Sequence, residues 1–235
     1  MWKWSVNNKE EFWKSIWEFS KIIGIFKNPV INKNKNFISV EFFKNCKINY
    51  TENLIRRNDN NKAISFYSEK KHERHYSWKK LNRSINNLSE YFININIKTN
   101  DRIVAVTPNL PETIISFLAT AKIGAIWSSC SADFGSSGVI ERFSQIKPKV
   151  IIISDYYYYN NKKIDVTKKI ISVIKNIKSI KNIIIIPFDG IKIKSKPKFN
   201  FINWNNIPGK IKNNKKYKIF KFNHPLYILY SSGTT

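Results

Sequence analysis

The sequence predicts an α/β fold in which crossover helices connect the strands of a largely parallel sheet. From residue 102 onward, short apolar runs typical of buried strands alternate with segments of helical length. Strands and helices that alternate in this way form right-handed crossover units, which join parallel strands. Residues 1–60 lack this alternation, and we expect them to form a helical and irregular arm that precedes the sheet.

The elements expected before the sheet follow from the spacing of apolar residues. Phe12, Ile16, Phe19 and Ile23 have the spacing of one helix face. The sequence then predicts, in order, a loop or wrapping arm over residues 28–49, a hairpin formed by residues 63–67 and the segment around Tyr76, and an amphipathic helix over residues 78–92 that Ser77 caps.

The alternating region predicts the sheet itself. Strands are expected at residues 102–106, 125–128, 150–153, 183–186 and 226–230, with helices over residues 111–124, 136–146 and 170–177. Pro111 suits the first position of its helix, where no backbone N–H is needed. The four tyrosines at 156–159 are expected to cover an edge of the sheet, with their hydroxyls toward water.

The strongly basic composition allows two interpretations. The formal net charge is +25, from 41 basic and 16 acidic residues, and such an excess is typical of proteins that bind nucleic acid. Only six of the basic residues are Arg, however, and the lysines are spread along the chain, for example Lys162-Lys163 and Lys168-Lys169, which we interpret as solvated. Lys, Asn and Ile are residues that an A+T-rich coding sequence favours. We expect no specific nucleic acid partner, and a basic nucleic-acid-binding protein remains the alternative.

Other classes of site find little support. The two cysteines, Cys46 and Cys130, form no metal or disulfide pattern, and His72 and His75 lack a third ligand, so no metal site is expected. The start of the chain does not have the pattern of a secretory signal, and no apolar run is long enough to cross a membrane. These features favour a cytoplasmic protein that does not bind membranes.

The last five residues have the composition of a phosphate-binding turn. Ser231, Ser232, Gly233, Thr234 and Thr235 follow an apolar run directly. Hydroxyls and backbone N–H groups can bind several phosphate oxygens at once, and Gly allows close approach of the backbone. Taken alone, these five residues favour an ordinary Ser/Thr turn over a phosphate site.

Longer motifs resolve this ambiguity through a resemblance. The run Tyr-Ile-Leu-Tyr-Ser-Ser-Gly-Thr-Thr resembles the start of the signature loop of adenylate-forming enzymes. The segments Asn109-Leu-Pro-Glu112, Gly124-Ala-Ile-Trp-Ser-Ser-Cys-Ser-Ala-Asp-Phe-Gly135 and Arg142-Phe-Ser-Gln-Ile-Lys-Pro-Lys-Val150 resemble the acetoacetyl-coenzyme A synthetase family in particular. Asn49-Tyr-Thr-Glu-Asn-Leu54 is similar to that family's N-terminal region, so the resemblance covers essentially the whole chain.

The resemblance implies an activity with ATP, Mg²⁺ and coenzyme A. A carboxylate, acetoacetate, would attack the α-phosphorus of MgATP, and the coenzyme A thiol would then displace AMP. Ser231, Ser232, Gly233, Thr234 and Thr235 would hold the ATP phosphates, and Ser131, Ala132, Asp133 and Lys162 would contact coenzyme A. The loop 131–133 could instead serve only to cap the next helix through Asp133 or Ser136.

The resemblance also implies that this chain is the N-terminal portion of a longer enzyme. Residues 1–60 would be the arm and residues 61–235 the first part of the AMP-binding domain, with no catalytic residue inside the chain, so that the chain alone is expected to be inactive. The family usually has Pro at Ala132 and Gly at Asn161. An acetyl- or propionyl-coenzyme A synthetase fragment, or a non-catalytic remnant, remains an alternative.

Overall fold

A five-stranded parallel sheet organises the chain. The computed structural model describes residues 1–32, 37–190, 200–209 and 217–231. The sheet has the strand order β13-β12-β9-β7-β8, in which every neighbouring pair is parallel. Its strands are β7 (Arg102–Val106), β8 (Ile126–Cys130), β9 (Val150–Ser154), β12 (Asn182–Ile186) and β13 (Ile202–Asn203). The predicted α/β class and parallel sheet are confirmed.

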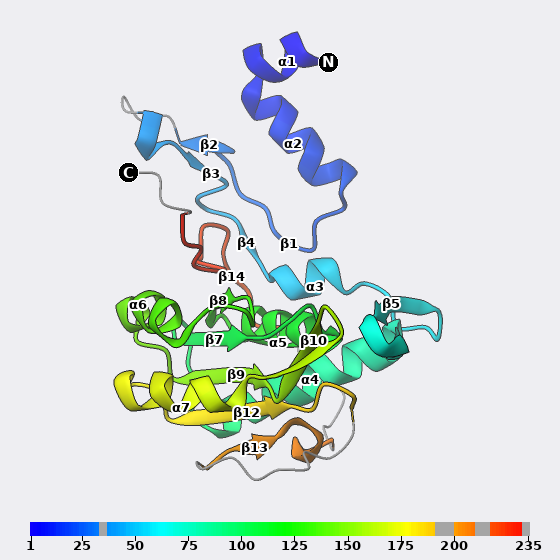
Figure 1. Cartoon of the computed structure of the whole chain (residues 1–235). Coiled ribbons are helices and arrows are strands. Elements are labelled where there is room, and N and C mark those ends of the chain that lie inside the picture. The colour runs from blue at the N-terminus through cyan, green and yellow to red at the C-terminus, as the bar shows by residue number, and fades with distance from the viewer. Residues whose placement is uncertain (33–36, 191–199, 210–216, 232–235) are drawn as a thin grey trace.

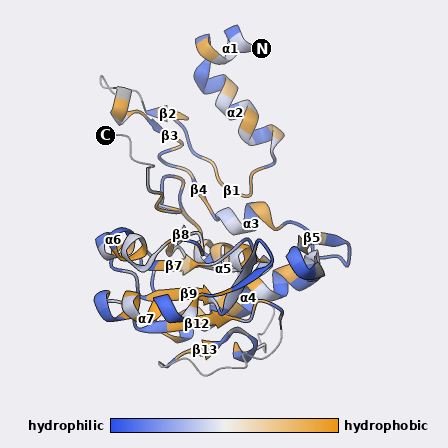
Figure 2. Ribbon diagram, viewed as in Figure 1, coloured by the Kyte–Doolittle hydropathy of each residue, from blue (hydrophilic) through white to orange (hydrophobic). Residues whose placement is uncertain are grey.

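Two pairs of helices cover the two faces of the sheet (Figure 1). Helices α4 (Trp78–Asn94) and α5 (Pro111–Lys122) pack on one face, and α6 (Ser136–Ile146) and α7 (Thr167–Asn176) pack on the other. Consecutive strand residues point to opposite faces, so Ala105 belongs to the first core and Val104 to the second. The strands of the sheet are accordingly among the most hydrophobic parts of the ribbon (Figure 2).

Local signals set the helix ends where the sequence predicts them. The Ser77 hydroxyl accepts a hydrogen bond from the Lys80 N–H at 3.2 Å, which caps α4. Pro111 occupies the first turn of α5. Beyond the end of α5, Gly124 has a φ of +73°, and a Cβ atom there would lie 2.3 Å from the Phe220 ring, so only Gly fits.

Two antiparallel hairpins flank the sheet. Strands β5 (Lys62–Tyr67) and β6 (Glu73–Ser77) form the predicted one. The second, β10 (Tyr156–Tyr159) with β11 (Lys162–Asp165), was not predicted. The tyrosine run is therefore a paired strand, and three of its rings pack on the core that α4 and α5 cover. The sequence gives little sign of it because the partner strand is polar.

The N-terminal arm is helical and irregular, as predicted. It contains α1 (Trp2–Asn7), α2 (Lys9–Phe19), α3 (Tyr50–Leu54) and the short pair β2 (Ile31–Asn32) and β3 (Glu41–Phe42). Strands β1 (Gly24–Ile25) and β4 (Lys47–Ile48) form an antiparallel sheet with β14 (Phe220–Lys221), far along the chain. Short 3₁₀ helices occur at Phe37–Ser39, Glu69–Lys71 and Trp204–Asn206. The domain boundary at residue 60 stays a prediction.

The predicted strand at 226–230 is wrong, because only one isolated parallel bridge forms, between Trp127 and Tyr227. The Trp127 N–H donates to the Leu226 carbonyl at 3.1 Å, and the Ile228 N–H donates to the Trp127 carbonyl at 2.8 Å. The Ser128 hydroxyl also donates to the Ile228 carbonyl at 2.9 Å, but the two backbone bonds of Trp127 are the only ladder bonds between these described segments. The segment therefore runs beside β8 without extending the sheet.

No helix within the described residues is both long and apolar enough to span a membrane.

Helix α4 should stabilise the protein mainly through the side chains that it packs onto the sheet. Phe92 is fully buried, whereas the next residue, Ile93, is 45% exposed. We expect Phe92→Ala to lower the free energy of unfolding by about 3–5 kcal/mol, through lost burial and a residual cavity. Ile93→Ala should cost well under about 1 kcal/mol. Urea unfolding followed by circular dichroism measures both, and equal losses would contradict this packing.

Candidate functional site

The carboxyl ends of the parallel strands gather the chemically interesting residues at one edge of the sheet. The chain runs from β7 outward to β8 and then returns to β9 on the other side of β7. In open parallel sheets, ligands bind beyond the carboxyl ends of the strands at such a reversal. The loops that follow β8 and β9 both begin at this edge.

The loop after β8, residues 131–135, is held in place by α7. The Lys169 ammonium group donates hydrogen bonds to the carbonyls of Ala132 and Phe134, the second at 3.0 Å. Ala132 is buried, while Ser131 and Asp133 are exposed. Gly135 is the N-cap residue of α6, so the capping role considered for Asp133 and Ser136 is not observed. The loop instead presents two polar side chains to solvent.

Asp133 is held in its charged form. A hydrogen bond from Ser131 is the main cause that lowers the pKa of Asp133, and the positive charge of Lys169 adds to it. Lys169 was interpreted from the sequence as a solvated residue, which is wrong: it is half-buried, and burial lowers its pKa. Its helical spacing from Ile170 and Val173 does not reveal that it reaches a neighbouring loop.

The extended segment that leads to Ser231 ends beside this loop. The bridge between Trp127 and Tyr227 starts the segment parallel to β8, and Tyr230 packs against the core cluster that includes Cys130 and Ala132, so Ser231 emerges at the same edge as loop 131–135. The Tyr230 hydroxyl donates to the Arg142 carbonyl at 2.7 Å, and the Arg142 guanidinium lies 4.6 Å from the centre of the Phe134 ring. Ser231 is exposed. Ser232, Gly233, Thr234 and Thr235 lie outside the described residues.

The β10–β11 hairpin presents Lys162 on one face. Tyr159 pairs with Lys162 and Tyr157 with Ile164, so these four side chains share a face of the hairpin. Tyr157 packs against the core cluster to which Cys130 and Ala132 belong, so this face lies toward loop 131–135. Burial raises the pKa of Tyr157, and the nearby charge of Asp133 raises it further. Lys162 is exposed, at the end of the hairpin beyond Tyr157.

The opposite face of the hairpin carries Lys163, which is also exposed but lies against an aromatic ring. The Lys163 ammonium lies 3.7 Å from the centre of the Tyr156 ring. Tyr156 and Tyr158 contact Phe188, which follows β12. The two adjacent lysines therefore have different environments.

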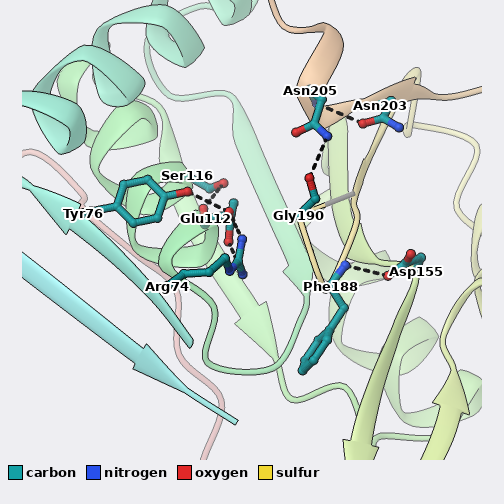
Figure 3. A network of polar contacts seen from close by, with 9 residues as sticks. All are labelled: Arg74, Tyr76, Glu112, Ser116, Asp155, Phe188, Gly190, Asn203 and Asn205. Atoms are coloured by element: carbon teal, nitrogen blue, oxygen red, sulfur yellow. Dashed lines mark hydrogen bonds and ion pairs between the residues drawn. The ribbon is translucent and has the colours of Figure 1, made fainter. Parts of the chain in front are cut away.

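Asp155 joins the ends of two neighbouring strands at this edge. Its carboxylate accepts a hydrogen bond from the Tyr156 N–H at 2.8 Å. It accepts a second from the Phe188 N–H, also at 2.8 Å (Figure 3). Burial nevertheless raises the pKa of Asp155 to about 6. Sequence analysis missed this residue, whose only signal is an acidic side chain directly after a buried strand.

A buried ion pair attaches the β5–β6 hairpin to α5. The Glu112 carboxylate binds both terminal nitrogens of Arg74, at 2.6 and 3.1 Å, and accepts a hydrogen bond from the Tyr76 hydroxyl at 2.9 Å (Figure 3). Glu112 is 3% exposed. The sequence singles out Glu112 only as the last residue of a motif, and its partner lies on a different element.

Comparisons with known proteins agree on one family. The model of the family described as AMP-binding enzyme matches residues 52–235. The chain is 37% identical, over 234 residues, to acetoacetyl-coenzyme A synthetase from Rhizobium meliloti (strain 1021), covering 99% of this chain and 36% of that protein. It is 36% identical to acetoacetyl-CoA synthetase from Xenopus tropicalis, covering 100% of this chain and 37% of that protein.

A solved structure has the same fold. Acetoacetyl-CoA synthetase from Streptomyces lividans superimposes with a TM-score of 0.89 at 27% identity, covering 99% of this chain and 36% of the other. The chain thus spans little more than a third of the length of each of these relatives.

The raised pKa of Asp155 should make stability depend on pH. The folded state binds this proton more tightly than the unfolded state does, so the stabilising contribution is complete below about pH 4 and is lost as the pH rises to about 6. Because the side chain is partly exposed, we expect a change of about 1–2 kcal/mol. Asp155→Asn should remove this change.

Urea unfolding of wild type and Asp155→Asn between pH 4 and 7 measures this pH-dependent change in the free energy of unfolding. The variant should gain stability relative to wild type as the pH rises. Asp165→Asn, at an exposed carboxylate of the same hairpin, is the control. A stability difference between wild type and Asp155→Asn that is constant over this range would contradict the assignment.

Proposed function

This chain belongs to the AMP-binding enzyme family, and we propose that the protein containing it converts acetoacetate, ATP and coenzyme A to acetoacetyl-coenzyme A, AMP and pyrophosphate. The choice of acetoacetate follows from the relatives, which are acetoacetyl-coenzyme A synthetases. The main support is the position of two segments at the carboxyl edge of the sheet. One is the loop from Ser131 to Gly135, which resembles the family's motif, and the other is the segment that leads to Ser231, where the proposed phosphate-binding residues begin.

The reaction has two balanced halves. In the first, a carboxylate oxygen of acetoacetate bonds to the α-phosphorus of ATP, and the bond to the bridging oxygen breaks to release pyrophosphate. In the second, the sulfur of coenzyme A bonds to the acyl carbon, its proton is lost, and AMP leaves. Mg²⁺ accompanies ATP and offsets the charge that develops on the leaving phosphates.

We assign Ser231, Ser232, Gly233, Thr234 and Thr235 to the β- and γ-phosphates of ATP. The exposed Ser231 hydroxyl fits such a role, because it emerges beyond the strand ends where anions can approach. The assignment of the other four residues rests on the sequence motif alone.

We assign Ser131, Ala132, Asp133 and Lys162 to the path of coenzyme A. Lys162 suits one of its phosphates because it is a cation and exposed, on the hairpin face that lies toward Asp133. Ala132 would contribute backbone only, since its side chain is buried. We also propose that the protein acts in the cytoplasm on small-molecule substrates, in keeping with the free thiols of Cys46 and Cys130.

Pyrophosphate exchange tests the acid substrate. With a protein that carries this chain together with the remainder found in the relatives, acetoacetate should support exchange between pyrophosphate and ATP more rapidly than acetate or propionate does. The rates would be compared at equal subsaturating acid concentrations. Faster exchange with acetate or propionate would reassign the substrate, and no exchange with any acid would exclude adenylate formation.

Two adjacent lysines test the coenzyme A contact. Lys162→Ala should raise the KM for coenzyme A about 5- to 20-fold, the loss expected for one charged hydrogen bond to a phosphate, and leave pyrophosphate exchange unchanged. Lys163→Ala removes the same charge from the opposite face, where the ammonium lies over the Tyr156 ring, and should change this KM less than about twofold. Equal effects of the two variants would point to general electrostatic attraction instead.

A further inference from the structure

The β10–β11 hairpin needs support from outside its own two strands. Isolated two-stranded hairpins are only marginally stable in water. Its two-residue turn consists of Asn160 and Asn161, with φ values of 49° and 60°. Both residues thus adopt the left-handed conformation that tight hairpin turns require, which Gly adopts without strain and Asn tolerates. The conformation of this turn therefore depends on contacts with other parts of the chain.

Glu69, on the tip of the other hairpin, supplies such contacts. One carboxylate oxygen accepts the Asn160 N–H at 3.1 Å, and the other accepts the Asn161 N–H at 2.7 Å. Both N–H groups of the turn are thereby bound by a single anion. Hydrogen bonds to a charged acceptor are stronger than those between neutral groups.

An aromatic contact reinforces the same junction. The His72 ring stacks on Tyr158, with centroids 5.9 Å apart and planes at 18°. Phe188 packs edge-on against both rings, at 5.7 Å from His72 and 5.8 Å from Tyr158. The tip of the β5–β6 hairpin therefore grips the β10–β11 hairpin through polar contacts at the turn and ring contacts along the strand.

The His72 contact lies on the face of the hairpin that does not carry Lys162, and the Glu69 contacts lie at the turn itself. Tyr158 and Lys163 share the gripped face, whereas Lys162 and Tyr157 share the other. Lys162 comes directly after the turn, so any movement of Asn160 and Asn161 displaces it. The contacts of Glu69 and His72 therefore hold the backbone next to Lys162 and leave its side chain exposed.

We propose that Glu69 is a positioning residue for coenzyme A: by binding the Asn160–Asn161 turn it sets where Lys162 meets a phosphate group of that substrate. The inference rests on the proposed function. Glu69 touches neither the loop 131–135 nor Ser231 in any recorded contact of the described residues, and its effect passes through the turn alone. In this proposal the hairpin serves the coenzyme A half of the reaction and has no part in adenylation.

Kinetic comparison of charge-matched variants tests this role in the whole protein. Glu69→Ala should raise the KM for coenzyme A about three- to tenfold and leave pyrophosphate exchange unchanged, as expected when hydrogen bonds to a charged acceptor are lost. Glu69→Gln keeps one acceptor oxygen and should give an intermediate KM. Glu73→Ala is the control, because this carboxylate lies on the same hairpin but contacts His75, at 2.5 Å.

Amide hydrogen exchange of residues 156–165, without coenzyme A, provides a readout that is independent of activity. Exchange should be faster in Glu69→Ala than in wild type or in Glu73→Ala. An unchanged rate of amide hydrogen exchange in Glu69→Ala overturns the inference. So does a KM for coenzyme A that rises in Lys162→Ala but not in Glu69→Ala. Faster amide hydrogen exchange in Glu69→Ala, with no change of the KM for coenzyme A in Glu69→Ala or Lys162→Ala, also overturns it. In that case the proposed contact of Lys162 with coenzyme A has failed, and the contact of Glu69 with the turn has not.

Discussion

Strands β7 and β9 are covered on both faces, and residues 103–106 and 150–153 have no solvent-accessible surface. A strand in this position can carry no exposed polar side chain along its length, so the first polar residues occur where the strand ends. Thr107 follows β7 in this way, and Asp155 follows β9. The core on both faces therefore determines where a ligand can meet polar side chains, because along β7 and β9 these side chains become accessible only where the strands end.

Contacts between elements distant in sequence then shape that edge. Lys169 on α7 holds the loop after β8, the Tyr230 hydroxyl donates to the Arg142 carbonyl within α6, and Asp155 joins β9 to Phe188, just beyond β12. Each contact ends on a backbone carbonyl or N–H group. The loops are thus held through their main chain, which leaves exposed side chains such as Ser131 and Asp133 available to a ligand.

Much of the fold could be predicted because its signals are local. Burial on both faces made the strands continuous apolar runs, and Ser77 and Pro111 marked helix starts by their own capping chemistry. Interactions between distant elements were not predictable in this way. Lys169 looked like any other surface lysine, the polar strand β11 had no apolar signal, and Glu69 gave no hint of a partner ninety-odd positions away. For the candidate site, motifs located the loops but not the residues that hold them.

The scarcity of glycine has a consequence for how the backbone is built. The chain contains only seven glycines, and among the described residues Lys21, Lys147, Asn96 and Asn100 also have left-handed φ values. A side chain in that conformation costs about 1 kcal/mol or more, except for Asn, which tolerates it best. Glycine occupies positions 24 and 124, where a Cβ atom would lie within 2.4 Å of neighbouring atoms. The backbone thus accommodates lysine or asparagine where the cost is a strained dihedral angle, and it excludes every side chain at the two positions where a Cβ atom would overlap its neighbours.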